Sequence, residues 1–273
     1  MKYIKLFETH QEYETYINDR QNLVLPNVSF CEDTPNEVHY NPYEEPDTRL
    51  IATFSGSGSK QLYGYEHMDY NVDGATLFNS IEIDGTDVSI QELDEAQGFY
   101  EFSADGEHVV KYTLKDPTRI DSYMFYSANP KTVIIPNTVT AIGVDAFYWC
   151  NDLTTVIIPN TVTTIERYAF EDSALASVTI PNSVTSIGEY AFYMCPNLSS
   201  IEIPSGVTSI GGSAFKDCEN LTSVTVKAVI PPTLGDSAFE ATNCPIYVPS
   251  ESVNTYKSAS GWSTYASRIQ AIQ

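Results

Sequence analysis

The chain has 273 residues, which is enough for two or three compact units, and 42% of them are hydrophobic, so it can bury a core. Only 18% of the residues are charged, yet the formal net charge at pH 7 is −22. Such an acidic surface repels phosphates, which argues against a nucleic-acid partner and against an anionic membrane surface. No segment approaches the roughly 20 apolar residues of a membrane-spanning helix, so membrane insertion is not expected.

Residues 1–47 are predicted to form one short helix followed by an extended segment. Thr9 and Glu12 have the spacing of a capping box at a helix start, and the Pro-, Asn- and Glu-rich stretch at 26–46 favours extended backbone. The opening residues lack the apolar core of a signal peptide. A virion-associated or cytoplasmic location therefore stays open beside a cell-surface or extracellular one.

Residues 48–116 are predicted to form a small β-sandwich-like domain. Short runs of strand-forming residues alternate with glycine turns. The runs are 49–54, 62–65, 78–83, 87–90, 99–103 and 108–114. Charge supports a boundary near residue 116, because residues 1–116 carry 23 Asp and Glu against 7 Lys and Arg, whereas residues 117–273 carry 13 against 7.

One motif in this region suggests a weak calcium site. Asp69, Asn71 and Asp73 precede Gly74 with the spacing of a calcium-binding loop. The carboxylate that such a loop needs at its last position is missing, because Ser80 occupies it. Asp and Asn before glycine are also ordinary turn residues. The turn is the simpler interpretation, and no metal or cofactor is expected.

An internal repeat in residues 117–249 predicts a solenoid. Prolines recur at steps of 22 or 23 residues, at Pro136, Pro159, Pro181 and Pro204. Ala-Phe pairs recur at steps of 22 to 24 residues, with their phenylalanines at Phe147, Phe170, Phe192, Phe215 and Phe239. Chance does not produce two such columns in register, so the sequence predicts about five stacked repeats.

Each repeat combines a short strand, a proline and an inward phenylalanine. In the segment 155–158, alternation places Val156 and Ile158 on the inner face. The proline that follows ends the strand, because proline cannot donate to a ladder. One repeat cannot bury its apolar face alone, so the units must stack. Ile134 and Ile157 are apolar at outward strand positions and are expected to dock the preceding domain.

Residues 250–273 are predicted to form a helical cap over the open end of the core. Ser250 is the expected N-cap of a helix that carries Tyr256. Trp262 and Ile269 continue at helical spacing beyond an interruption at Gly261. A polar-faced tail of this kind would shield the last repeat from solvent.

A cysteine recurs three residues after the repeat phenylalanine, at Cys150, Cys195 and Cys218, and Ser173 takes the remaining position. The chain has five cysteines without the spacing of a disulfide framework. The column is more simply interpreted as small buried side chains near backbone groups than as a metal or redox site. We therefore expect free thiols that hold no metal.

Residues 178–198 follow the pattern Val-x-Ile-Pro-x-x-Val-x-x-Ile-Gly-x-x-Ala-Phe-x-x-Cys-x-x-Leu, which resembles the BspA-like leucine-rich repeat. The resemblance covers residues 120–249, with departures at Glu166, Ser173 and 231–234. The tail, and more weakly the first 45 residues, are similar to proteins of Bacteroidales and their phages. The resemblance implies cell-surface adhesion or host-protein binding and no catalytic residue.

The sequence shows no motif of a known catalytic centre. The chain contains no P-loop, no Gly-x-Ser-x-Gly elbow, no His-Glu-x-x-His and no Cys-x-x-Cys. Cys31 and His39 are eight residues apart and are more simply interpreted as isolated residues than as a catalytic pair. The protein is therefore not expected to be an enzyme.

Side chains next to the repeat phenylalanines are the first candidates for partner binding, and these are Tyr148, Trp149, Tyr193 and Met194. Stacking would bring them into a column, and exposed aromatic side chains favour contacts with proteins or sugars. Packing against neighbouring turns is the alternative interpretation. Thr179 and Glu202 point outward from the strands and offer a second, polar candidate face.

The leading hypothesis is a non-catalytic binding or adhesion protein whose leucine-rich-repeat solenoid recognises a protein or glycan partner. The alternative is a structural or assembly component of a phage virion, attached through its N-terminal region. The identity of the ligand, the oligomeric state and the place of display stay open.

Overall fold

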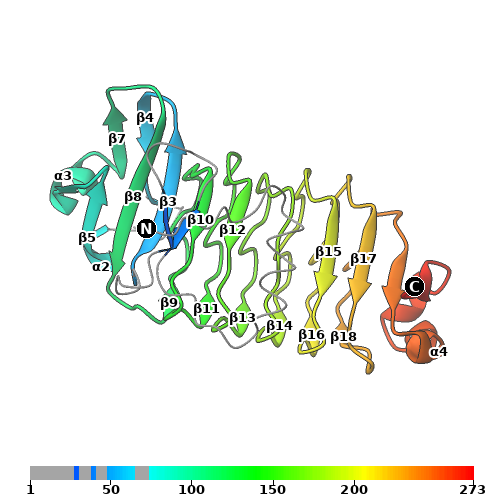
Figure 1. Ribbon diagram of the computed structural model, residues 1–273. Coiled ribbons are helices and arrows are strands. Elements are labelled where there is room, and N and C mark those ends of the chain that lie inside the picture. The colour runs from blue at the N-terminus through cyan, green and yellow to red at the C-terminus, as the bar shows by residue number, and fades with distance from the viewer. Residues whose placement is uncertain (1–27, 31–37, 41–47, 65–73) are drawn as a thin grey trace. The chain divides into compact units, whose positions relative to one another are not determined.

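The computed structural model describes residues 28–30, 38–40, 48–64 and 74–273 (Figure 1). The chain forms two compact units, residues 1–48 and residues 49–273. In the first unit, β1 (Val28–Phe30) pairs antiparallel with β2 (Val38–Tyr40). The helix predicted after Thr9 and the weak calcium candidates Asp69, Asn71 and Asp73 lie outside the described residues.

The second unit begins with an antiparallel sheet in the order β3-β8-β5-β6. Its strands are β3 (Leu50–Ser55), β5 (Phe78–Ile83), β6 (Thr86–Val88) and β8 (Glu107–Leu114). A separate antiparallel pair is formed by β4 (Gly58–Gln61) and β7 (Phe99–Phe102). Two short helices, α2 (Gly74–Leu77) and α3 (Ile90–Glu95), lie in the connections.

Four of the six predicted strand runs in this region correspond closely to strands, and two differ. The run at 62–65 is not a strand in its described part; β4 ends at Gln61, and Leu62 and Tyr63 are buried beyond it. The run at 87–90 ends at Val88, because the side chain of Ser89 accepts a hydrogen bond from the backbone N–H of Glu92 and caps α3.

The antiparallel sheet continues directly into the solenoid. Strand β3 pairs antiparallel with β10 (Thr132–Ile134), the first long strand of the repeats, and Ile134 lies opposite Ile51. The hydroxyls of Thr53 and Thr132 hydrogen-bond across this pair. The β-sandwich-like domain predicted for residues 48–116 thus shares a six-stranded sheet with the repeats, so the sheet does not stop at the predicted boundary.

The solenoid has a long side and a short side, each built from parallel strands (Figure 1). The long side contains β10, β12 (Thr155–Ile157), β15 (Ser200–Ile203), β17 (Ser223–Val226), β19 (Ile246–Val248) and β20 (Ile269–Ala271). The short side contains β9 (Arg119–Ile120), β11 (Ala141–Ile142), β13 (Thr164–Ile165), β14 (Ser186–Ile187), β16 (Ser209–Ile210) and β18 (Thr233–Leu234). The fold is a mainly β solenoid, as predicted, and it has about seven turns where about five repeats were expected.

One predicted strand is missing from the long side. Val178 and Ile180 are 6% and 5% exposed, so they face inward as predicted, but the segment around them joins no ladder. The turn that contains this segment has one of the short phenylalanine steps, 22 residues from Phe170 to Phe192. The long side is therefore divided into a sheet before this segment and a sheet after it.

Each proline starts the corner that leads from the long side to the short side. The carbonyl of Pro159 accepts a hydrogen bond from the N–H of Val162, which closes a tight turn, and three neighbouring prolines do the same. After the short strand the chain again passes close to the preceding turn. A Cβ on Gly188 would lie 2.6 Å from the backbone nitrogen of Arg167, so glycine permits this approach.

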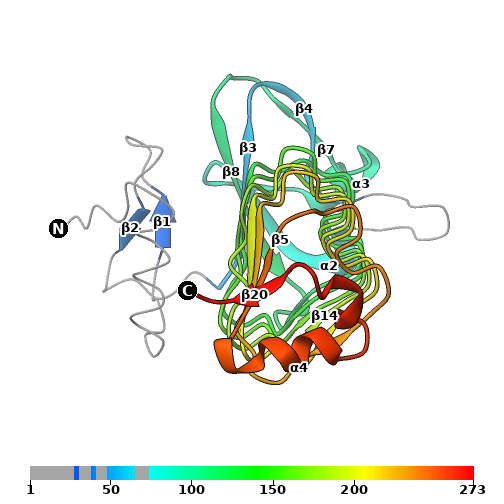
Figure 2. The same cartoon turned by 90° about the vertical axis from the view of Figure 1, so that its right-hand side faces the viewer.

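Six phenylalanines form a continuous stack along the inside of the third side, where the chain returns to the next turn. Their ring centroids are 5.1 to 5.5 Å apart and adjacent rings are nearly parallel. The stack consists of Phe125, Phe147, Phe170, Phe192, Phe215 and Phe239. In Figure 2, which looks along the solenoid, the successive turns lie over one another, as this stacking requires.

Aromatic residues close both ends of the phenylalanine stack. At one end the ring of Tyr112 on β8 meets Phe125 edge-on at 5.4 Å. At the other end Trp262 and Tyr265 lie 5.9 and 5.7 Å from Phe239. The stack therefore runs without a gap from the antiparallel sheet to the C-terminal cap.

The C-terminal cap is only partly helical. It contains the 3-10 helix η1 (Ser250–Ser252), the α-helix α4 (Val253–Ser258) and the 3-10 helix η2 (Trp262–Tyr265). The helical pattern ends before Ile269, which begins strand β20 and pairs in parallel with Ile246 of β19. Ser250 makes no capping hydrogen bond to the helix; its hydroxyl bonds to Glu251.

Candidate functional site

The returning side of the solenoid carries side chains that we call the turn ridge, and it is our candidate binding surface. It consists, in each turn, of the residue directly after the Ala-Phe pair and of two residues with positive φ, two positions before and two positions after the phenylalanine. The two positive-φ columns are continuous over six turns and contain no glycine. Trp149 and Met194, with φ of 57° and 54°, occupy one of them and are 45% and 43% exposed. The left-handed backbone at these positions is thus a regular part of the repeat.

A first aromatic group on the turn ridge joins two successive turns. The rings of Tyr126 and Tyr148 stack at 5.0 Å with an angle of 2° between them. The indole of Trp149 is tilted against both, at 6.3 Å from Tyr126 and 5.2 Å from Tyr148. In this group two stacked tyrosines support the partly exposed indole of Trp149. Binding surfaces with aromatic anchors have the same arrangement.

A second aromatic group lies on the following two turns. Tyr168 and Tyr190 stack at 4.9 Å, and Tyr193 meets Tyr190 edge-on at 5.4 Å. The guanidinium of Arg167 lies over the ring of Tyr168 at 4.6 Å. The turn ridge therefore already accepts one cation on an aromatic face.

Glu171 occupies the tyrosine column between the two groups. Its residue is 8% exposed, and its Oε2 is buried with no hydrogen-bond partner. The hydroxyl of Tyr148 donates a hydrogen bond to this carboxyl group, while Asp145 and Asp172 repel its charge. Burial is the largest effect and raises the pKa of Glu171 from 4.5 to about 7. A carboxyl group that changes charge near neutral pH thus lies in the middle of the turn ridge.

The structure places four of the predicted candidate residues on the turn ridge and adds a fifth residue to it. Tyr148 and Trp149 are in contact, and Tyr193 and Met194 lie two turns further along, as stacking predicts. Glu171, in the turn between these two pairs, is not among the residues predicted for this surface, and it is buried. The sequence does mark this residue. Directly after the repeat phenylalanine, the turns before and after carry Tyr148 and Tyr193, and Glu171 is the carboxylate between them.

The second candidate face lies on the long side of the solenoid. Thr179 is half-buried in the segment that forms no strand, and Glu202 on β15 is exposed. The carboxylate of Glu202 forms an ion pair with Lys227 at 3.1 Å, with both side chains largely open to solvent. A solvent-exposed pair of this kind contributes little free energy, so this face offers less for a partner to recognise.

The cysteine column is structural. The thiols of Cys150, Cys195 and Cys218 each donate to the carbonyl of a phenylalanine in the preceding turn, at 3.1 to 3.2 Å. These cysteines and Cys244 are buried and free. Burial raises the pKa of the Cys150 thiol, which keeps it protonated and unreactive. Among the described residues no group of His, Cys, Asp and Glu has the arrangement of a metal site.

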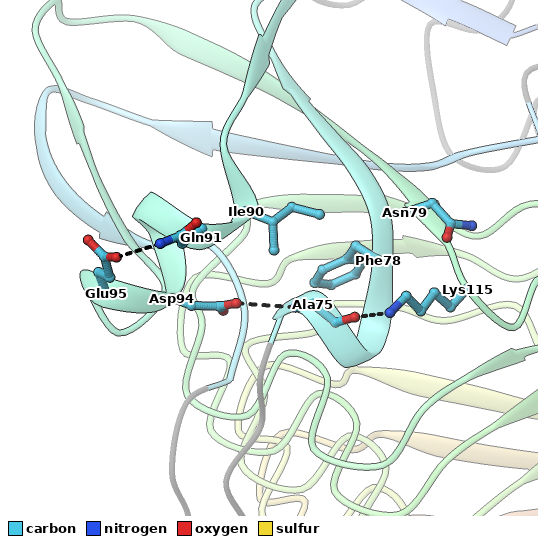
Figure 3. Close-up of a pocket in the computed structure, with 8 residues that line it drawn as sticks. All are labelled: Ala75, Phe78, Asn79, Ile90, Gln91, Asp94, Glu95 and Lys115. Carbon is cyan, nitrogen blue, oxygen red and sulfur yellow. Dashed lines mark hydrogen bonds between the residues drawn. The ribbon is translucent and has the colours of Figure 1, made fainter.

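An open groove of about 700 Å³ lies beside α2 and α3 (Figure 3). Phe78 and Ile90 are its apolar residues, and the rest of its lining is mainly polar. The carboxylate of Asp94 is already engaged, because it accepts hydrogen bonds from the Gly74 N–H at 2.8 Å and the Tyr63 hydroxyl at 2.5 Å. Lys115 donates to the carbonyl of Ala75. With its charged groups satisfied internally, the groove is a weaker candidate than the turn ridge.

The repeat region matches a known family. Residues 118–245 match the BspA type leucine rich repeat region, in six copies. The match spans slightly less than half of the chain and contains the whole turn ridge. A comparison with curated proteins gave no match. None of the helices in the described part of the chain has the length and apolarity that crossing a bilayer requires.

Solved structures with similar repeats include three from different bacteria. A leucine-rich repeat protein of T. pallidum is 22% identical over 56% of this chain and 78% of that one, with a TM-score of 0.40. A leucine rich cell surface protein of Faecalibacterium prausnitzii is 31% identical over 43% of this chain and 40% of its own, with a TM-score of 0.30. A leucine-rich repeat protein of Bacteroides ovatus is 23% identical over 56% and 50%, with a TM-score of 0.35.

Proposed function

We propose that this protein is a non-catalytic binding protein that recognises a protein or glycan partner through the turn ridge. The observation that carries the proposal is the pair of exposed anchors, Trp149 and Met194, on a rigid ridge of stacked tyrosines. Large apolar side chains in an otherwise acidic surface are costly to leave in water, and a partner that covers them gains their burial. A rigid ridge also loses little entropy on binding.

Binding assays with paired variants test this proposal. The purified protein is screened against immobilised proteins and glycans, and each ligand found is measured again with Trp149→Ala and with Tyr193→Ala. We expect both variants to weaken binding by at least about 1 kcal/mol, because aromatic anchors dominate interfaces. Thr225→Ala on the long side is the matched control and should bind normally. Unchanged binding by both ridge variants would place the site elsewhere, with the face around Thr179 and Glu202 as the next candidate.

These binding assays do not test the second prediction, attachment to a phage particle. It depends on the N-terminal region, most of which lies outside the described residues. Detection of the protein in purified phage particles would support it, whereas a ligand bound through the turn ridge supports recognition.

A further inference from the structure

Glu171 indicates which chemical group of a partner the turn ridge would bind. Its Oε2 is buried without a hydrogen-bond partner, and the residue as a whole is more than nine-tenths buried. A buried carboxylate oxygen with no donor costs free energy in the folded protein. Because Oε2 bonds to nothing, no hydrogen bond of that oxygen is lost if the carboxylate turns towards an incoming donor.

The surroundings of Glu171 select for a positive charge. Asp145 and Asp172 flank it, and the hydroxyls of four tyrosines feel its charge; these are Tyr126, Tyr148, Tyr168 and Tyr193. The negative faces of aromatic rings attract cations within about 6 Å. Arg167 over Tyr168 at 4.6 Å is an internal example on the same ridge. A second cation therefore finds both rings and an unpaired carboxylate oxygen here.

We propose that the turn ridge binds a lysine or arginine side chain of a protein partner, with Glu171 accepting a hydrogen bond from the cationic head and the rings of Tyr148 and Trp149 flanking its apolar stem. This inference rests on the proposed function and narrows it to a basic protein segment. Lysine and arginine stems cover apolar surface while their heads keep polar contacts, which matches an apolar rim around a carboxylate. The formal charge of −22 also favours the approach of a basic partner.

The experiment uses the full chain and two acetylated, amidated peptides that are identical except at one central position, lysine in one and norleucine in the other. Binding is followed by tryptophan fluorescence at pH 8 and about 150 mM salt. Trp149 is 45% exposed and Trp262 is fully buried, so a change in emission reports on the ridge. We expect the lysine peptide to bind at least about tenfold more tightly than the norleucine peptide, since hydrogen bonds between charged groups are the strong ones.

Two variants separate the role of Glu171 from general electrostatic attraction. Glu171→Gln keeps the shape of the side chain and should reduce affinity for the lysine peptide by about tenfold. Glu219→Gln removes the same charge from an exposed position and should leave affinity unchanged. Burial raises the pKa of Glu171 to about 7, so the wild-type affinity should rise between pH 6 and pH 8 and that of Glu171→Gln should not.

Four results would overturn this inference. Equal binding of the two peptides, or full binding by Glu171→Gln, would show that the ridge makes only apolar contacts. No fluorescence change at millimolar peptide would show that it takes no basic segment. Binding of neutral oligosaccharides that depends on Trp149 but not on Glu171 would assign the ridge to glycans. Oligosaccharide binding, like equal binding of both peptides, leaves the proposed function intact. The proposed function fails only if the ligands found bind equally well to the Trp149→Ala and Tyr193→Ala variants.

Discussion

At the scale of single residues, Glu171 shows how one departure from the repeat pattern can create a buried acidic group. The column that it occupies has tyrosine in the turns before and after it, and Glu171 itself is only 8% exposed. A tyrosine there would continue the aromatic column, whereas a carboxyl group is removed from water with one hydrogen bond from Tyr148. The repeat supplies the burial, and the substitution supplies an acid with an altered proton affinity.

A pH-dependent stability follows from this burial. The pKa of Glu171 is 4.5 when exposed and about 7 in the folded chain. Below pH 4.5 the group is protonated in both states and its contribution to stability is fully present. As the pH rises the unfolded chain releases the proton first, so this contribution declines and is gone above about pH 7. Glu171→Gln carries no such proton and should be more stable than wild type at pH 8, by about 1–3 kcal/mol.

Urea unfolding at several pH values from 5.5 to 8.5 measures this difference and stays clear of the isoelectric point near 4.3. The gap between wild type and Glu171→Gln should widen as the pH rises. Glu219→Gln serves as the control, because it removes the same charge from an exposed position. A constant gap over the whole range would mean that Glu171 is not buried in its protonated form.

At the scale of the repeat element, the phenylalanine stack makes each turn depend on its neighbours. Phe170 is fully buried and lies 5.1 Å from Phe147 and 5.3 Å from Phe192. The backbone repeats the pattern, since the N–H of Phe147 donates to Ala169 and that of Phe170 donates to Ala191. Removing one ring therefore removes packing from three turns at once.

Phe170→Ala should destabilise the chain by about 3–5 kcal/mol, the usual cost of deleting a large buried side chain. Hydrogen exchange should accelerate at the amides of Phe147 and Phe192 as well as at the substituted turn. Thr163→Ala, an exposed change one corner away, should leave both stability and exchange nearly as they are. Faster exchange confined to one turn would show that the turns are not coupled through the stack.

The repeat could be predicted from the sequence because its signal is periodic. Two columns recur over five units, and any stacked arrangement places Phe170 between its neighbours. The departures come from tertiary contacts that have no period. Ile269 continues a helical spacing in the sequence, but its backbone is drawn into a strand by the free edge of β19. The burial of Glu171 likewise depends on how adjacent turns close over it, which no periodic pattern in the sequence records.

At the scale of the whole second unit, the antiparallel sheet and the solenoid share one core. Strand β3 adds to β10, and the buried ring of Tyr112 on β8 closes the end of the phenylalanine stack at Phe125. The hydroxyl of Tyr112 donates to the carbonyl of Leu62 at 2.7 Å, which fixes the ring in this position. A solenoid needs a cap at each end, and here the N-terminal cap is the sheet itself.

This arrangement predicts that damage in the sheet spreads into the repeats. Tyr112→Ala should cost about 3 kcal/mol or more, because it opens a cavity against Phe125 and leaves the Leu62 carbonyl without its donor. Hydrogen exchange measured by mass spectrometry should then accelerate in β10 and β12, not only in β3 and β8, since these strands belong to one sheet. Tyr112→Phe keeps the ring and loses only the hydrogen bond, so its effect should be about 1–2 kcal/mol. If Tyr112→Ala loosens β3 and β8 while β10 keeps its protection, residues 48–116 behave as the separate domain that charge and composition predict, and the shared sheet does not couple them.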